Sequence, residues 1–292
     1  MNFLSPENHE NTILEEVDFQ FNCFGIQDAE TLPHWHKHTE IIYVRRGTCA
    51  VYTNGTAVIC EEGDILLVPH GSLHSILPQI PAEYFAIVIG STLFVAMMQD
   101  RHCEAALRPF LSGGSLAPLH LTHSDASYFE FAKLINNIIK EDFDKEKNYQ
   151  LLIKVGLLQF FTHLIRYFPD VLHAQLDTHN QANNTILMKQ ALEYLSLHYR
   201  EKITIADMSA HSNLSDQHFC RLFKSYTGKT FINYLTDLRL EHANRLLTDT
   251  DNPITVIPEM IGFCNANYFA RIYKNRYGHS PSYVRKNGSA MN

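Results

Sequence analysis

The sequence predicts two domains, an N-terminal all-β barrel with appended helices and a C-terminal all-α domain built from a double helix-turn-helix. Three observations indicate this division. The first 120 residues hold short runs of β-branched and aromatic residues between turn signals, which is typical of strands. From Ser124 onward the apolar residues recur with a helical period. A length of 292 residues is also enough for about two domains of roughly 100–200 residues each.

Charge is divided unequally between the two halves. The whole chain carries a formal net charge of −7, which taken alone argues against a nucleic-acid partner. Residues 1–180 hold 11 Lys and Arg against 22 Asp and Glu, whereas residues 181–292 hold 13 against 9. A basic half inside an acidic chain is a hint of a nucleic-acid-binding module.

Five strands are predicted in the N-terminal half, at residues 40–46, 49–53, 57–60, 65–68 and 84–89. Gly47 marks a turn between the first two strands. Asn54-Gly55 predicts a tight hairpin, because both residues accept a positive φ. Several short strands at this spacing are typical of a small barrel or sandwich.

Two amphipathic helices are predicted next, over residues 127–143 and 148–167. One interpretation is that they only cover the barrel. The second helix carries more apolar residues than a one-sided cover requires, so we expect a homodimer through helices within 127–167, and through Leu151–Ile165 in particular. The polar segment that follows lacks an apolar period. The predicted domains are therefore residues 1–175 and 185–288, joined by a linker at 176–184.

The C-terminal half contains an internal repeat. The segment that begins at Ile205 recurs at Ile254, an offset of 49, and the segment Phe219–Gly228 recurs from Phe269, an offset of 50. Two copies of this size fit a pair of helix-turn-helix units. Residues 231–247 read as one continuous helix, which would hold the two units about 34 Å apart, one turn of DNA.

Each copy has the pattern of a recognition helix that buries one apolar stripe. Ser215 is the predicted N-cap of the first. The outward residues are Gln217, His218, Arg221 and Lys224 in the first copy, and Asn267, Ala270, Arg271 and Lys274 in the second. Arg and Asn bond guanine and adenine edges in the major groove, although a merely solvated face has the same composition. Phosphate contacts are expected from Lys229, Arg276, Arg285 and Lys286.

These residues resemble the DNA-binding domain of the AraC/XylS family of bacterial transcription regulators, over about residues 185–285. The most specific matches are Leu238-Arg239-Leu240, Ala243, Leu246-Leu247, Gly262-Phe263, Tyr268-Phe269, Arg271, Tyr273-Lys274, Tyr277-Gly278 and Ser280-Pro281. The resemblance implies that one chain contacts two successive major-groove segments of double-stranded promoter DNA, with RNA polymerase as a further partner of an activator. It implies base-facing positions at Gln217, Cys220, Arg221, Ala266, Asn267, Ala270 and Arg271.

Two residues depart from the usual pattern of this family. Pro258 stands where Ala is usual, inside the first helix of the second copy. Proline there removes a backbone donor, at a cost of about 3 kcal/mol unless the helix starts late or kinks. Val284 stands where an aromatic residue is usual. The effect of Pro258 on the second helix-turn-helix therefore stays open.

A group of histidines precedes the first predicted strand. On a continuous strand, His34, His36, His38 and Glu40 would share one face. Together with the later run from Gly63 to His74, they resemble the two motifs of cupin barrels. That resemblance implies that His34, His36, Glu40 and His74 form an effector pocket or a three-His, one-carboxylate site for Mn, Fe, Ni or Zn. Both interpretations stay open, and a regulator requires no cofactor.

Taken together, these features predict a DNA-binding transcription regulator that responds to a small-molecule effector in the cupin-like barrel. A sugar is the family's commonest effector type. The alternatives are a metal-dependent cupin enzyme fused to a DNA-binding domain and a regulator without an effector. Six scattered cysteines and the lack of an apolar run of about 20 residues predict a soluble, cytoplasmic protein with no membrane partner. The residues do not select the effector, the operator, or activation over repression.

Overall fold

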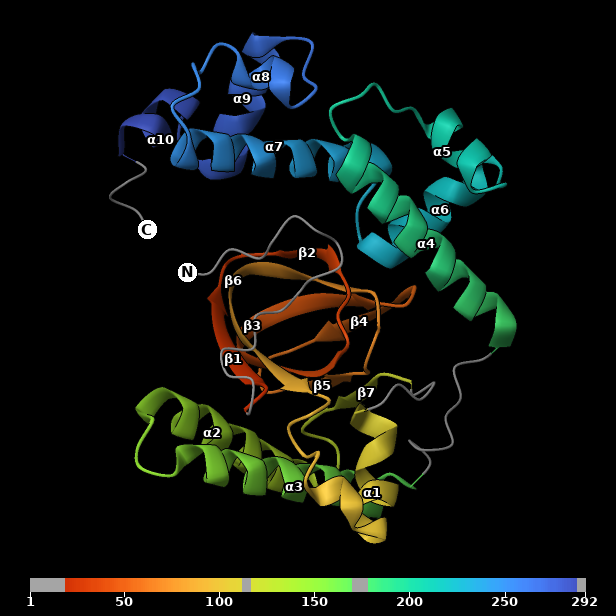
Figure 1. Cartoon of the computed structure of the whole chain (residues 1–292), viewed down its shortest axis with the longest axis vertical. Coiled ribbons are helices and arrows are strands. Elements are labelled where there is room, and N and C mark those ends of the chain that lie inside the picture. Colours follow the sequence, from red (N-terminus) through yellow and green to blue (C-terminus); the bar gives the residue numbers. More distant parts are fainter. Residues whose placement is uncertain (1–18, 112–116, 170–177, 288–292) are drawn as a thin grey trace. The chain divides into compact units, whose positions relative to one another are not determined.

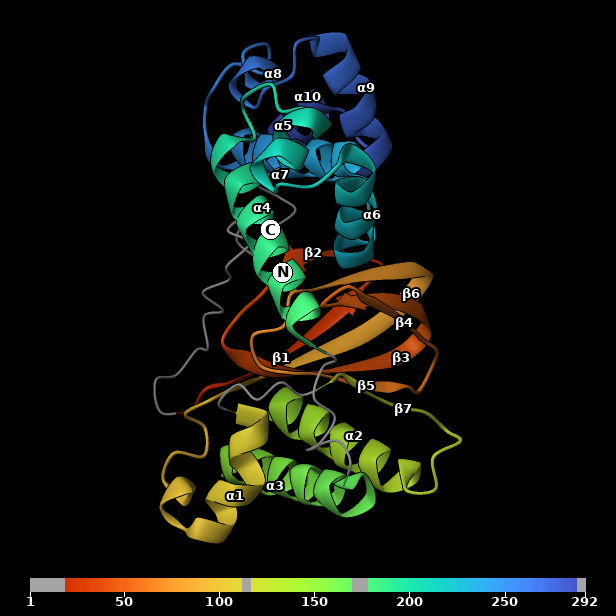
Figure 2. The same cartoon turned by 90° about the vertical axis from the view of Figure 1, so that its right-hand side faces the viewer.

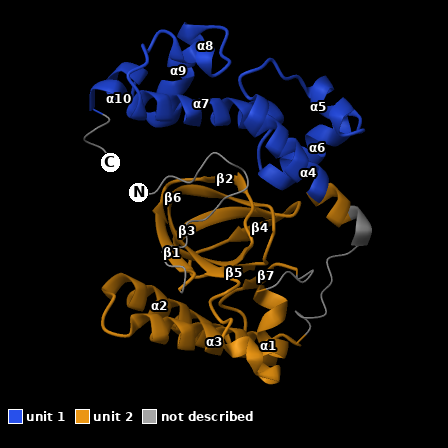
Figure 3. Ribbon diagram, in the orientation of Figure 1, with its two compact units in different colours: residues 1–10, 186–292 blue, residues 11–185 orange. Residues whose placement is uncertain are grey.

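The structure is a computed structural model that describes residues 19–111, 117–169 and 178–287. The chain divides into two compact units, one within residues 11–185 and one within residues 186–292 (Figure 3). The first is built on an antiparallel sheet and the second is helical, as the sequence predicts. Within the described residues, every helix is too short or too polar to cross a membrane.

The described part of the first unit contains one antiparallel sheet of seven strands (Figure 1). Its order is β1-β6-β3-β5-β7, with β2 also on β6 and β4 also on β3. The strands are β1 Phe21–Gln27, β2 Thr31–His34, β3 His38–Thr53, β4 Thr56–Cys60, β5 Ile65–Val68, β6 His74–Gly90 and β7 Leu119–Leu121.

β3 and β6 are the two longest strands of this sheet. They pair from His38 opposite Gly90 to Thr53 opposite His74, and the register shifts on both sides of Arg46. Gly47 lies in this bulge with φ +79°, and a Cβ there would clash with the carbonyl oxygen of Pro81. The prediction of two strands separated by a turn at Gly47 is therefore wrong, because this glycine allows one strand to bulge and continue.

Alternate residues of the strands enter two different apolar clusters. The cluster on one face includes Ile42, Leu66 and Ile76. The cluster on the other face includes Ile41 and Leu67, and it packs against three helices. These helices are α1 Arg101–Leu111, α2 Tyr128–Asp144 and α3 Tyr149–Tyr167, preceded by a 3-10 turn at Met97–Gln99 (Figure 2). The helices predicted at 127–143 and 148–167 correspond to α2 and α3.

The second unit is built from two long helices, α4 and α7, and several shorter ones. The helices are α4 Thr178–His198, α5 Ile205–His211, α6 Asp216–Thr227, α7 Phe231–Asp249, α8 Ile257–Met260, α9 Ala266–Tyr277 and α10 Pro281–Asn287. The continuous helix predicted at 231–247 corresponds to α7. With 19 residues, α7 is about 28 Å long, and it separates the two helix-turn-helix units, α5–α6 and α8–α9.

The predicted linker at 176–184 is helical from Thr178 onward, while its first two residues lie outside the described part of the chain. The buried stripe of α4, which includes Met188, Leu192 and Leu195, begins only after this segment. Packing of this buried stripe stabilises α4, so the helix can extend through the polar residues before it although they show no apolar period. The two compact units divide inside α4, between Thr185 and Ile186.

The second copy of the repeat accommodates Pro258 by starting its first helix late. α5 begins at Ile205, whose equivalent in the second copy is Ile254, but α8 begins only at Ile257. Pro258 is therefore the second residue of α8, in the first turn, where a backbone N–H has no helical acceptor. The proline shortens the helix and does not interrupt it.

Candidate functional site

The helices α6 and α9 are capped in the same way at both ends. The Ser215 hydroxyl accepts the His218 backbone N–H at 3.3 Å, and the Asn265 side-chain oxygen accepts that of Tyr268 at 3.0 Å. Both helices end at a glycine with positive φ, Gly228 or Gly278. These caps fix where each helix begins and therefore which residues its N-terminal half presents.

Each of the two helices buries one stripe and exposes the other. Phe219 and Phe223 of α6 are buried, as are Phe269 and Tyr273 of α9. Most of the residues predicted to contact DNA are exposed, and they include Gln217, His218, Arg221, Lys224, Asn267, Ala270, Arg271, Lys274 and Arg276. Cys220, Lys229 and Arg285 are half-buried. Figure 2 shows α6 and α9 along the same side of this unit.

A second group of polar side chains lies in the first unit where β2, β3 and β6 meet. His34 ends β2 and lies opposite His74, the first residue of β6. Glu40 lies in β3, and His36 lies in the short connection between β2 and β3. All four side chains are buried, and one donor atom from each lies within 4.8 Å of the other three. This set, His34, His36, Glu40 and His74, is called the His–Glu cluster below.

Glu40 is the centre of the hydrogen bonds in the His–Glu cluster. Its Oε2 atom lies 3.0 Å from Nε2 of His36 and 3.0 Å from Nε2 of His74. Burial alone would raise the pKa of Glu40, but the neighbouring His74 and the hydrogen bonds from both histidines hold it well below its usual range. Burial, followed by the charges of His74 and His36, holds the pKa of His34 well below its ordinary value.

His38 does not join the His–Glu cluster, which corrects the prediction that four alternating residues share one face. β2 ends at His34 and β3 begins only at His38, so residues 35–37 break the period of two. The His38 ring lies 5.5 Å from that of His36, outside the group of converging donor atoms. Burial, together with the charges of His36 and His70, lowers the pKa of His38 to about 4.

Comparison with known proteins identifies both units. An AraC-like ligand binding domain matches residues 25–135, and a helix-turn-helix domain matches residues 208–287. The chain belongs to the AraC family. It is a DNA-binding transcription regulator with a ligand-binding domain, and this family is not an enzyme family. Cupin-type catalysis is therefore not its function.

Two relatives that match most of this AraC-family chain are HTH-type transcriptional regulators. It is 25% identical to the HTH-type transcriptional regulator YdeC of Bacillus subtilis, over 87% of this chain and 86% of the relative. It is 24% identical to an HTH-type transcriptional regulator of Staphylococcus aureus, over 90% of this chain but only 34% of the relative. Among solved structures, ToxT from Vibrio cholerae aligns over 92% of this chain and 98% of its own, at 13% identity and a TM-score of 0.37.

Two cations that were expected to contact phosphates in this AraC-family chain instead hold its fold together. The Lys229 ammonium pairs with Asp237 at 2.5 Å. The Arg285 guanidinium donates to the carbonyl oxygens of Leu246, Leu247 and Asn252, at 2.8–3.1 Å. Both cations are satisfied inside the unit, so the expectation that they contact DNA is withdrawn. Arg276 and Lys286 are exposed, so we still expect them to contact phosphates.

Two of the three histidines in the His–Glu cluster, His34 and His74, are oriented by backbone carbonyl groups. Nδ1 of His34 donates to the Leu32 carbonyl at 2.8 Å, and Nδ1 of His74 donates to the Ser72 carbonyl at 3.0 Å. A neutral ring with its proton on Nδ1 presents a lone pair at Nε2. At His74 that lone pair would face the Glu40 carboxylate, so the contact requires either a second proton on His74 or a cation between them. Carbonyl-oriented imidazoles of this kind are typical of metal ligands, so the residues fit a divalent metal.

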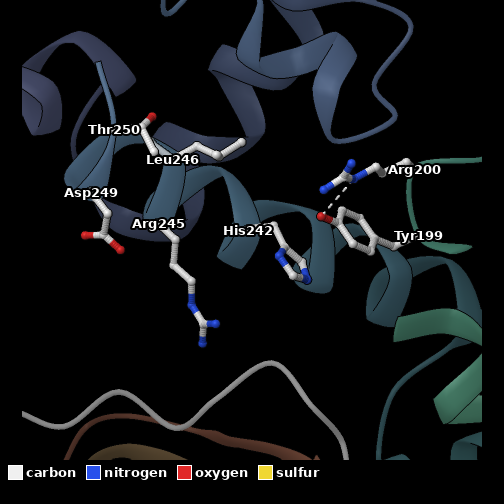
Figure 4. A pocket seen from close by; sticks show the side chains of 7 residues that line it. All are labelled: Tyr199, Arg200, His242, Arg245, Leu246, Asp249 and Thr250. Atoms are coloured by element: carbon white, nitrogen blue, oxygen red, sulfur yellow. Dashed lines mark hydrogen bonds between the residues drawn. The ribbon is translucent and has the colours of Figure 1, made fainter. Parts of the chain in front are cut away.

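The second unit also contains a pocket of about 250 Å³ that the sequence analysis missed (Figure 4). It is lined by Tyr199 and Arg200 after α4 and by α7 residues that include His242 and Arg245. The Tyr199 and His242 rings stack 3.9 Å apart at 4°. Burial, then the charges of Arg245 and Arg200, lowers the pKa of His242 to about 4. No local signal identifies this pair, because its members are far apart in the sequence.

Proposed function

We propose that this AraC-family regulator reads promoter DNA with the exposed faces of α6 and α9 and responds to an effector at the His–Glu cluster. The main support for DNA binding is that α6 and α9 are capped in the same way and expose Arg221 and Arg271 at equivalent positions. On this basis Gln217, His218, Arg221, Asn267, Ala270 and Arg271 contact base edges, whereas Lys224, Lys274 and Arg276 contact phosphates.

Substitution of one proposed base reader and one proposed phosphate contact tests this assignment. Arg271→Ala should weaken binding to a specific site by about 1–3 kcal/mol and relax the preference at one base pair. Lys274→Ala should weaken binding to all sequences alike and flatten the salt dependence. Binding titrations at several salt concentrations measure both effects. Unchanged specific binding by Arg271→Ala would remove Arg271 from the base readers.

The finer part of the proposal is that a divalent transition metal is held by His34, His36, Glu40 and His74. The support is the carbonyl-fixed orientation of His34 and His74 and the convergence of one donor atom from each of the four side chains to within 4.8 Å of one another. A sugar-sized effector would need these buried side chains to move apart. A bound metal would supply a positive charge that attracts an oxygen or nitrogen atom of a polar effector.

Elemental analysis and thermal-shift measurements with Mn, Fe, Ni and Zn salts test the metal. The wild-type chain should contain near-stoichiometric metal and gain in Tm, because a ligand of the native state stabilises it. Glu40→Gln should lose both effects, and His38→Gln, just outside the His–Glu cluster, should keep both. A metal-free protein whose Tm responds to none of the salts would contradict the metal and leave a polar effector or an effector-independent regulator.

Two further partners belong to the proposal. We infer a homodimer formed through α2 and α3, because Leu151, Leu152 and Val155 of α3 remain 60%, 51% and 43% exposed. Binding at a promoter also implies a cytoplasmic protein that works beside RNA polymerase.

A further inference from the structure

Tyr268 is an exposed aromatic residue on the recognition helix α9, one helical turn before Arg271. Its side chain is 44% exposed although it is large and aromatic. The Arg271 guanidinium carbon lies 5.5 Å from the centre of the Tyr268 ring. Residues three apart are neighbours on a helix surface, and a guanidinium within about 6 Å of a ring centroid is attracted to its π face. The exposed ring therefore touches the side chain that is proposed to read a base.

The Tyr268 ring is itself held in place. Its backbone N–H is fixed by the Asn265 cap at 3.0 Å. Its ring centre lies 6.1 Å from that of Phe263, which is only 8% exposed. Phe263 is packed in turn against the Phe269 ring at 5.5 Å and below the Arg239 guanidinium at 5.9 Å. Tyr268 is thus the exposed member of a cluster of three aromatic rings, and the buried members support the ring that Arg271 contacts.

The first copy of the repeat lacks this arrangement. His218 occupies the position equivalent to Tyr268, and Arg221 the position equivalent to Arg271. An imidazole offers a smaller π face than the phenol ring of tyrosine, which with Trp and Phe is a usual partner of a guanidinium. The two arginines therefore stand at equivalent positions but with different support.

We propose that Tyr268 is a positioning residue that orients the Arg271 guanidinium for base recognition. A free arginine side chain loses rotamer entropy when it is fixed. A ring that already restricts the side chain reduces this loss at the moment of binding, so the second helix-turn-helix discriminates its base more sharply. This inference rests on the proposed function, in which Arg271 reads a base.

A double-mutant cycle tests the proposal on the full-length chain. The quantity measured is the ratio of Kd values for the specific site and for the same site with the Arg271 base pair changed. Tyr268→Ala should reduce this ratio by about 2–5-fold, the size of a coupling of about 0.5–1 kcal/mol. Tyr268→Phe should retain the ratio, because it keeps the ring. In an Arg271→Ala background, Tyr268→Ala should have no further effect.

Two matched variants separate positioning from a merely structural role. Tyr268→Leu keeps an apolar contact with Phe263 but has no π face, so it should lose discrimination as Tyr268→Ala does while its Tm stays near that of the wild type. Tyr283→Ala removes an exposed tyrosine of α10, outside the two recognition helices, and should leave discrimination at the Arg271 base pair unchanged. The salt slope should be the same for all of these variants.

The outcomes distinguish this inference from the function on which it rests. If Arg271→Ala loses discrimination but Tyr268→Ala and Tyr268→Leu keep it, the base reader stands and the positioning role is overturned. If Tyr268→Phe loses discrimination as Tyr268→Ala does, the phenol hydroxyl and not the ring is the cause, and the positioning role is overturned. If Arg271→Ala itself leaves discrimination unchanged, Arg271 does not read a base and Tyr268 does not position it.

Discussion

At the scale of single residues, His242 links the stability of the second unit to pH. Burial and the charges of Arg245 and Arg200 lower its folded-state pKa to about 4, against about 6.5 for an unfolded histidine. Between these two values the unfolded chain binds more protons than the folded chain. Folding stability contributed by this group is therefore present above pH 6.5 and is lost as the pH falls toward 4.

His242→Phe should reduce this acid sensitivity, because phenylalanine keeps a ring against Tyr199 but does not titrate. After allowance for solvent screening, the difference between pH 7 and pH 5 should shrink by about 1 kcal/mol, or about 2–4 °C in Tm. Thermal unfolding of both proteins at the two pH values measures the effect. Equal Tm shifts for the variant and the wild type would mean that His242 does not titrate as described.

Helical periodicity in the sequence predicts which side chains of a helix are exposed. Contacts between residues far apart in the chain could not be predicted in this way. The period of 3.6 residues predicts that Phe219 and Phe269 are buried and that Arg271 is exposed, as the structure shows. The acceptors of Arg285 lie up to 39 residues earlier in the chain, at the end of α7. Nothing in the local sequence distinguishes the half-buried, structural Arg285 from the exposed Arg271.

At the scale of elements, α3 combines a buried face with an exposed apolar one. Leu157, Phe160 and Leu164 are buried, whereas Leu151 and Val155 stand one turn apart and exposed. If this exposed face forms the homodimer, Leu151→Asp combined with Val155→Asp should convert the dimer to a monomer, because each buried carboxylate would lack a partner. Sedimentation or light scattering at micromolar concentration measures the mass.

Leu197→Asp is the matched control for the dimer variant. Leu197 is 77% exposed, but it belongs to α4 in the second unit and is not part of the proposed face of α3. It should remain dimeric. A wild-type chain that is already monomeric, or a Leu151→Asp, Val155→Asp chain that stays dimeric, would contradict a dimer through α3.

The helices could be predicted from the sequence more completely than the strands. Amphipathic periods gave α2, α3 and α7 nearly residue for residue, because each buries one stripe. The sequence analysis missed β1, β2, β7 and the first half of β6. Pro78 and Pro81 lie in that half of β6 and weaken any strand signal, and β3 supplies the pairing that holds it.

At the scale of the whole molecule, the net charge of −7 conceals two unlike halves. The acidic half contains the ligand-binding domain, and the basic half contains the paired helix-turn-helix units. Non-specific DNA affinity should therefore be modest and steeply salt-dependent, which leaves the two recognition helices to supply discrimination. An effector can alter DNA binding only through a different affinity for the two states of the chain, and this condition applies to a metal as much as to a sugar.

Selection of binding sites from a random DNA pool tests the central claim most directly. Two recognition helices on one chain predict two blocks of preferred bases, about 10–10.5 base pairs apart from centre to centre. Arg221→Ala should erase preference in one block and Arg271→Ala in the other. A pool with a single block, or one in which both variants erase the same positions, would contradict a chain that reads two successive major-groove segments with α6 and α9.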